Sequence, residues 1–188
     1  MAALFAGGKQ NLMIDFSRNY FELFGLPQRF GCDPGSLEDA YRRLQTEVHP
    51  DRFASGSDQE KRLALQSSAR VNEAYRALKD PVSRAQYLLS LNGIDALSET
   101  DTQLPLEFLE RQLERRETAA EAAGNKDSQT IASIAEDVRG EADALVDTLI
   151  HALDDDRAYS DARMRVRELK FLSKLAGDLD AIQGTLDD

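Results

Sequence analysis

Apolar side chains recur at helical spacing along most of the chain. They return at intervals of three and four residues, whereas long alternations of apolar and polar residues and turn-bounded clusters of β-branched residues are missing from the sequence. The pattern predicts helices at about residues 20–26, 36–48, 57–79, 82–91, 105–123, 128–153 and 159–186. We therefore expect an all-α fold.

The predicted helices at 36–48 and 57–79 flank a short loop. Ser36 is expected to cap the first helix, and Ser57 with Glu60 has the spacing of a capping box at the start of the second. Their apolar faces are formed by Leu37, Tyr41, Leu44 and Val48 in the first helix and by Leu63, Ser67, Val71, Ala74 and Leu78 in the second. Two antiparallel helices, a helical hairpin, should result.

The last three predicted helices have the pattern of a small antiparallel bundle. The apolar stripes of the second and third of them are Ile131, Ile134, Val138, Ala142, Leu145, Leu149 and Leu153, and Ala162, Val166, Leu169, Leu172, Leu175, Leu179 and Ile182. A polar run at 98–103 is the best domain boundary, and residues 1–18 show no pattern and are expected to be a disordered extension. We therefore divide the chain into residues 1–18, 19–97 and 98–188.

Charge is spread unevenly over the 188 residues. Residues 1–92 carry a net charge of +1, whereas residues 93–188 carry −12, with 23 Asp and Glu against 11 Lys and Arg. A half this acidic repels phosphate backbones and anionic lipid, which excludes nucleic acid and membrane surfaces as its ligands. A protein partner with basic or apolar surface fits better.

Metal and membrane chemistry have little support in the sequence. Cys32 is the single cysteine, so this chain alone builds neither a disulfide framework nor a paired-cysteine zinc site. Only two histidines occur, and His151, far from the first, is expected to be solvated or packed. No apolar stretch approaches the roughly 20 residues that span a membrane. We expect a soluble, cytoplasmic protein without a cofactor or metal.

The loop between the two hairpin helices carries the tripeptide His49-Pro50-Asp51. Pro50 disfavours helical geometry at His49, so the first helix should end there and present the tripeptide at the tip of the hairpin. A hydrolytic dyad is one alternative, but it needs a nucleophile in hydrogen-bond reach, and no Ser, Thr or Cys is placed nearby by a Gly-rich turn. A second alternative is a structural turn in which His49 and Asp51 cap helix ends. We expect no enzymatic activity.

In this setting the sequence resembles the J-domain family. The matching segments are residues 19–27 (NYFELFGLP), 41–44 (YRRL) and 71–78 (VNEAYRAL). Within that family the chain is most similar to the HscB branch, the co-chaperones of iron–sulfur cluster assembly, through residues 53–57 (FASGS), 84–91 (RAQYLLSL) and 165–175 (RVRELKFLSKL). The resemblance covers about residues 19–185. It implies a J-domain at 19–97 and a three-helix client-binding domain at 98–188.

The resemblance implies a co-chaperone that stimulates the ATPase of a DnaK or HscA-type chaperone and delivers an IscU-type scaffold protein to it. The chaperone-binding residues would be His49, Pro50, Asp51, Arg42, Arg43 and Arg52. The Asp51 carboxylate offers two acceptor oxygens suited to an arginine of the partner. The alternatives are a general J-domain protein for other clients and a helical interaction protein with a degenerate J-domain. The paired cysteines of the zinc-binding extension in eukaryotic relatives are absent, which indicates a bacterial-type protein.

The predicted helix at 105–123 carries a stripe of glutamates. The stripe consists of Glu110, Glu114, Glu117 and Glu121, at spacings of four, three and four residues. Leu109 and Leu113 lie alongside, either as a binding surface or turned into the core behind a solvated face. The resemblance implies that a scaffold binds at Leu109, Glu110, Leu113, Glu114, Glu117, Glu121 and Phe171, although the branch often has an apolar residue where Glu110 stands. Phe171 is expected either to anchor this interface or to lap over the bundle core.

Overall fold

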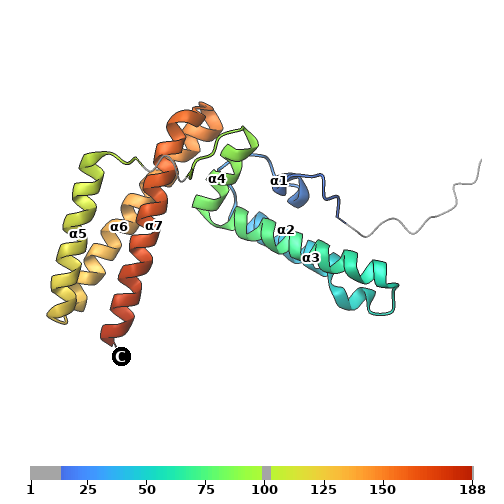
Figure 1. Ribbon diagram of the computed structural model, residues 1–188, viewed down its shortest axis with the longest axis horizontal. Coiled ribbons are helices and arrows are strands. Elements are labelled where there is room, and N and C mark those ends of the chain that lie inside the picture. Colours follow the sequence, from blue (N-terminus) through green and yellow to red (C-terminus); the bar gives the residue numbers. More distant parts are fainter. Residues whose placement is uncertain (1–13, 99–102, 188) are drawn as a thin grey trace, which may run out of the picture. The chain divides into compact units, whose positions relative to one another are not determined.

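The computed structural model describes residues 14–98 and 103–187, and every regular element within them is a helix (Figure 1). The predicted all-α fold is confirmed. Packing divides the chain into two compact units. The first contains the chain up to Gln28 together with Cys32–Asp80, and the second contains Arg29–Gly31 together with the chain from Pro81 onward. None of the helices in the described ranges is long and apolar enough to cross a bilayer.

The first unit is a helical hairpin with a short helix packed on it. Its elements are α1 (Tyr20–Phe24), α2 (Pro34–Val48), η1 (Pro50–Phe53) and α3 (Asp58–Lys79). Figure 1 shows α2 and α3 running side by side with η1 at the tip of the hairpin. Helix α1 ends earlier than predicted because Gly25 takes the left-handed conformation, with φ of 67°, that terminates helices.

The hairpin helices begin with side-chain caps, one of which differs from the prediction. Ser57 and Glu60 form the predicted capping box, in which the Ser57 amide donates to the Glu60 carboxylate at 2.7 Å. In α2 the cap is Asp33, not Ser36: the Asp33 carboxylate accepts from the Ser36 amide at 2.8 Å and from its hydroxyl at 2.7 Å. Pro34 lacks an amide hydrogen and fits the first helical position, so the helix begins two residues earlier than predicted.

The core of the first unit follows most of the predicted apolar stripes, although Tyr41 and Leu63 are only half-buried. Its buried side chains include Phe21, Phe24, Leu37, Leu44, Val48, Val71, Ala74 and Leu78. Tyr41 was predicted to join them, but its ring stacks on Tyr75 at a centroid distance of 4.0 Å while its hydroxyl donates to Asn72 at 2.9 Å. The phenol oxygen thus stays in polar contact at the edge of the core.

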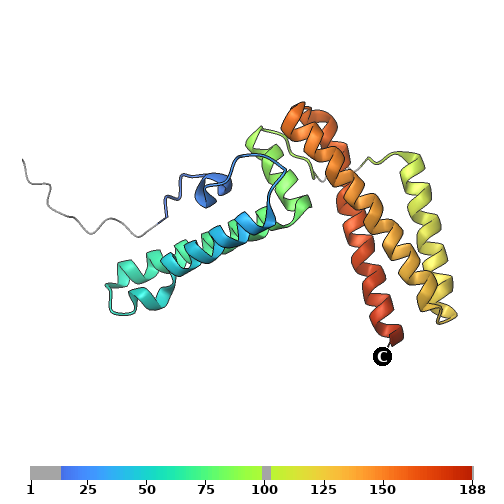
Figure 2. The same cartoon turned by 180° about the vertical axis from the view of Figure 1, so that it is seen from behind.

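The second unit contains α4 (Pro81–Leu91), α5 (Leu106–Gly124), α6 (Ser128–Ile150), η2 (His151–Asp155) and α7 (Tyr159–Asp187). Figures 1 and 2 show α5, α6 and α7 side by side, as predicted for a bundle. Their core includes Phe108, Ile131, Ala135, Val138, Leu172, Leu175 and Leu179. The helix predicted at 128–153 changes to a π-helical turn at η2, where the Asp156 amide donates to the His151 carbonyl at 3.0 Å.

Helix α4 packs with the second unit, so the packing units divide between Asp80 and Pro81, whereas the boundary predicted from polarity lies near Ser98. The reason is burial, because α4 lies against α7 and buries its own apolar side chains. The segment after α4 is held in the same way, since the Arg167 Nε donates to the Ala96 carbonyl at 3.0 Å. The sequence becomes more polar near Ser98, but the residues before and after this point pack in the same unit. Residues 99–102 of the predicted boundary, and most of the predicted extension at 1–18, lie outside the described residues.

The short segment Arg29–Gly31 belongs to the second unit although it lies between α1 and α2 in the sequence. The Asp154 carboxylate of η2 accepts from the amides of Phe30 at 2.6 Å and Gly31 at 2.7 Å. The Phe30 ring is fully buried, with the Arg84 guanidinium 5.0 Å from its centroid. A side chain at position 31 would press on Asp154, since an added Cβ would lie 3.1 Å from that carboxylate.

Candidate functional site

The His-Pro-Asp loop lies at the junction of α2 and η1. His49 ends α2 in an extended conformation, and Pro50 begins η1, as expected where proline blocks helix continuation. The His49 Nδ1 accepts from the Asp51 amide at 3.3 Å. The Asp51 side chain is 90% exposed and the His49 side chain 53%, with 3.6 Å between the His49 Nδ1 and the Asp51 carboxylate. The loop therefore presents an open carboxylate beside an imidazole.

The hydrogen bonds of the loop can be compared with the two alternatives, a structural turn and a hydrolytic dyad. His49 does cap η1, but the Asp51 carboxylate caps no helix end within the described residues. A hydrolytic dyad would need a hydroxyl or thiol bonded to His49, and no such hydrogen bond occurs in the part of the chain that the structure describes. The neighbouring Thr46 hydroxyl donates instead to the Arg42 carbonyl at 2.8 Å. The carboxylate is left available for a partner.

The three arginines predicted to surround the loop are held differently. The Arg52 guanidinium donates to the Thr46 carbonyl at 3.2 Å and lines a shallow hollow with His49. Arg42 lies one helical turn before Thr46 on α2, and its Nε donates to Glu38 at 3.1 Å. Arg43 is exposed and lies about 100° around the helix from Arg42. The structure thus brings Arg52 to His49 and places Arg42 and Arg43 farther along α2.

Glu38 fixes the position of Arg42. Its carboxylate accepts from the Tyr75 hydroxyl of α3 as well as from Arg42. The Tyr75 hydrogen bond, followed by that from Arg42, holds the pKa of Glu38 below its ordinary value. An acceptor that stays charged keeps the guanidinium of Arg42 on the α2 surface.

A second set of predicted residues lies on α5. Glu110, Glu114, Glu117 and Glu121 are all exposed. The Leu109 and Leu113 side chains are also on the surface, with exposures of 41% and 59%, rather than in the bundle core. Leu106 continues this row at 69% exposure and was not among the predicted residues, although its spacing of three from Leu109 was a signal. We call Leu106, Leu109 and Leu113 the leucine row.

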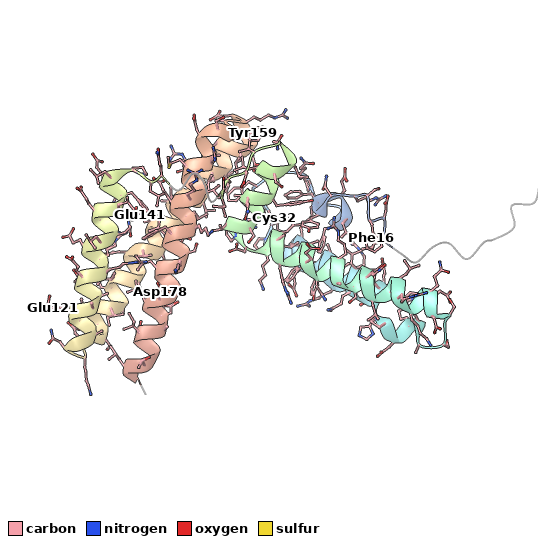
Figure 3. All side chains as sticks on the ribbon, viewed as in Figure 1. Phe16, Cys32, Glu121, Glu141, Tyr159 and Asp178 are labelled. Atoms are coloured by element: carbon pink, nitrogen blue, oxygen red, sulfur yellow. The ribbon has the colours of Figure 1, made fainter. Side chains whose placement is uncertain are left out.

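The arginines of α5 turn away from the glutamates. Arg111 and Arg115 both donate to the Glu141 carboxylate of α6, the former at 3.0 Å. Arg116 places its guanidinium 5.1 Å from the centroid of the Phe171 ring. In the described ranges, none of the four glutamates forms an ion pair. Figure 3 labels Glu121 on α5 and Glu141 on α6. The α5 arginines therefore do not pair with the glutamate stripe within the described residues.

Glu141 is held ionised by these arginines. Burial, the largest single influence, favours the neutral acid, but the hydrogen bonds from Arg115 and Arg111 together hold the pKa of Glu141 below its ordinary value. The pKa of the neighbouring Glu168 is shifted the other way: burial raises it above its ordinary value, and the negative charge of Glu141 raises it further. One charged carboxylate thus adds to the apolar packing between α5 and α6.

Replacing Glu141 with glutamine should lower the stability of the chain at neutral pH by about 1 kcal/mol, since the charge-assisted hydrogen bonds are lost. A carboxylate whose pKa is lowered by folding stabilises above its unfolded pKa, and this contribution is lost as the pH falls through the folded value. The difference from the parent chain should therefore shrink below about pH 4, as thermal melts between pH 3 and 7 would measure. Glu136→Gln, an exposed change on the same helix, is the control. An equal difference at both ends of the pH range would contradict this role of the Glu141 charge.

Phe171 lies at the edge of the bundle core. It is half-buried and meets Phe108 of α5 edge to face at a centroid distance of 5.6 Å. The ring therefore laps over the edge of the core, as one of the two expectations has it, whereas its part in an interface stays a prediction. Beside it lies a hollow that sequence reasoning missed, lined in part by Lys170 and Lys174. The signal was the spacing of four between these lysines on either side of Phe171.

The described residues contain no cluster of three or more His, Cys, Asp or Glu side chains arranged to hold a metal. The His151 Nδ1 lies 2.9 Å from the Asp155 carboxylate, one helical turn away, and both side chains are exposed. His151 therefore has a local surface partner, as expected for a solvated histidine.

Known proteins match the chain over both units. Residues 19–87 match the DnaJ domain family, and residues 104–180 match the family described as the HSCB C-terminal oligomerisation domain. A co-chaperone protein HscB homolog of Burkholderia vietnamiensis is 40% identical over 171 residues, which cover 90% of this chain and 96% of the relative. The chain belongs to the HscB family of co-chaperones.

Solved structures of HscB proteins share the fold. The chaperone HscB from Vibrio cholerae is 34% identical, with a TM-score of 0.80 over 90% of this chain and 99% of that protein. Human co-chaperone HscB is 27% identical, with a TM-score of 0.83 over 95% of this chain and 93% of that one. The predicted HscB resemblance is thereby confirmed, and with it the co-chaperone class.

Proposed function

We propose that this HscB family member stimulates ATP hydrolysis by a DnaK-type chaperone, of the HscA kind, and delivers an IscU-type iron–sulfur scaffold protein to it. The observation that carries the proposal is the Asp51 carboxylate, 90% exposed at the tip of the α2–α3 hairpin. An open carboxylate of this kind can accept two hydrogen bonds from an arginine of a docking partner. His49 and Pro50 hold the turn that presents it.

The chaperone would dock along the hairpin. Arg52 lies beside His49, and Arg43 adds an exposed positive charge farther along α2, where Arg42 is paired with Glu38. Exposed charges of this kind mainly raise the rate of association and contribute little to the lifetime of a complex. Such fast exchange suits a switch that acts briefly in each ATPase cycle. This chain itself would carry out no chemistry.

The scaffold would bind on α5 and α7. The leucine row offers apolar side chains at 41–69% exposure, which is the kind of surface that a partner covers. Phe171 adds a rigid aromatic edge beside it, and the glutamate stripe, with no ion pair in the described residues, adds negative charge. The scaffold should therefore present an apolar patch flanked by basic residues. We place this exchange in the bacterial cytoplasm.

A steady-state ATPase assay tests the proposal. The purified HscA-type chaperone should hydrolyse ATP faster when this chain is added, and the IscU-type scaffold should increase the effect further because the chain brings both to one complex. If unfolded peptides replace the scaffold with equal effect, the chain is a general J-domain protein. If the chain changes the rate of neither an HscA-type nor a DnaK-type chaperone, its J-domain is degenerate and the proposal fails.

A further inference from the structure

A hollow opens on the side of α7 next to Phe171. Its apolar lining comes from Leu97, Leu104 and Phe171, its cationic members are Arg167, Lys170 and Lys174, and Ser98 completes it. We call these seven residues the α7 hollow. Arg167 is fixed there by the hydrogen bond from its Nε to the Ala96 carbonyl, 3.0 Å long. The hollow therefore combines apolar side chains with the positive charges of one arginine and two lysines.

The lysines of the α7 hollow are unusual for this half of the chain. Residues 93–188 carry a net charge of −12, yet Lys170 and Lys174 lie one turn apart on the same face of α7. Like charges at this spacing repel one another. Within the described ranges, neither lysine forms an ion pair, and both are exposed. A negatively charged ligand would relieve this repulsion.

The α7 hollow is continuous with the surface proposed to hold the scaffold. Phe171 lines the hollow and also contacts Phe108 and Arg116 of α5. Arg116 follows Leu109 and Leu113 at spacings of seven and three, so helical geometry puts all three on one flank of α5. That flank faces Phe171. The leucine row, the Phe171 ring and the α7 hollow thus form one strip across the bundle.

We propose that the α7 hollow binds an apolar side chain of the scaffold that is flanked by one or more carboxylates. This inference rests on the proposed function and adds a second, oppositely charged contact to it. The apolar lining would take the side chain, and Lys170 and Lys174 would pair with the acidic neighbours. One partner would then meet negative charge on α5 and positive charge on α7. A surface with both signs admits one orientation of its partner, because the reversed orientation places like charges together.

Charge reversal at the hollow tests the inference. Calorimetry would measure binding of the purified IscU-type scaffold to the full-length parent, to Lys170→Glu/Lys174→Glu and to the control Lys61→Glu/Lys126→Glu, which changes the net charge equally at two exposed lysines elsewhere. We expect the hollow variant to bind about tenfold more weakly than the control at about 0.05 M salt, with a smaller difference at about 0.5 M, where screening is stronger. Circular dichroism would check that both variants fold.

Zero-length cross-linking of the parent complex gives an independent measurement. A carbodiimide joins lysines to carboxylates that touch, so mass spectrometry should find Lys170 or Lys174 linked to an Asp or Glu of the scaffold. Equal binding by the hollow and control variants, or the absence of these cross-links in a complex that forms, would overturn the inference and leave the proposed function standing. If the parent chain binds no scaffold at all, the proposed function fails and the inference with it.

Discussion

Asp51→Asn should abolish stimulation of the chaperone ATPase while the helical signal and melting temperature of the chain stay unchanged. Asparagine keeps the shape of the side chain but removes its charge, and losing one partner of a close, desolvated charge pair costs about 2–5 kcal/mol of binding. The fold should tolerate the change because the Asp51 side chain is 90% exposed. Single-turnover and steady-state ATPase rates with the HscA-type chaperone would measure the effect.

Asp178→Asn is the matched control, because it removes the same charge from an exposed position on α7 in the other unit (Figure 3). It should stimulate ATP hydrolysis as the parent does. An Asp51→Asn chain that stimulates equally well would show that the loop carboxylate is not the switch. A loss of helical signal in that variant would instead show that Asp51 supports the fold.

Replacing both Leu109 and Leu113 with alanine should give the second large effect, a loss of scaffold affinity. If both side chains anchor the interface, each should contribute about 1–3 kcal/mol, and the loss should appear mainly as faster dissociation. Salt should barely change it, since apolar contacts are not screened. Surface plasmon resonance with immobilised scaffold would measure both rates for the full chain.

Leu65→Ala is the control for this variant, because the Leu65 side chain on α3 is 58% exposed, close to the 59% of Leu113. It should leave scaffold binding intact. The melting temperature of the double variant should also stay near that of the parent, given the exposure of both leucines. Unfolding of the double variant would place these side chains in the core and remove the basis for the leucine row.

Periodicity predicted α3, α6 and α7 well because each of these carries a long apolar stripe, and local chemistry predicted several helix ends. The capping box at Ser57 and the helix end before Pro81 are read from neighbouring residues. The start of α2 was missed because Asp33 and Ser36 are both good caps, and the choice between them depends on Pro34. The site residues came from the family resemblance, whereas the Asp51 exposure needed the structure.

The contacts between residues far apart in the chain could not be predicted from the sequence. Nothing near Phe30 indicates that its amide meets Asp154, more than a hundred residues later. Nor does composition show that α4 packs on α7, since the polar run begins only after it. On α5, periodicity did not decide whether Leu109 and Leu113 lie in the bundle core or on its surface, because a helix with so many charges has no single apolar face. The structure shows that Phe108, Ala119 and Ala122 face the bundle, which leaves the leucines outside.

The clamp of Asp154 on Arg29–Gly31 limits how the J-domain can be exchanged between proteins. A chimera that joins a foreign hairpin at Pro81 would also replace the Phe30 and Gly31 that fill the other unit. The remaining half would then expose the apolar contacts of Phe30 and leave the half-buried Asp154 carboxylate without the two backbone amides that donate to it, and hydrogen bonds to charged groups contribute about 1.5–3 kcal/mol. A graft that keeps this contact must therefore retain residues 29–31 together with Asp154, so the portable segment is larger than the hairpin itself.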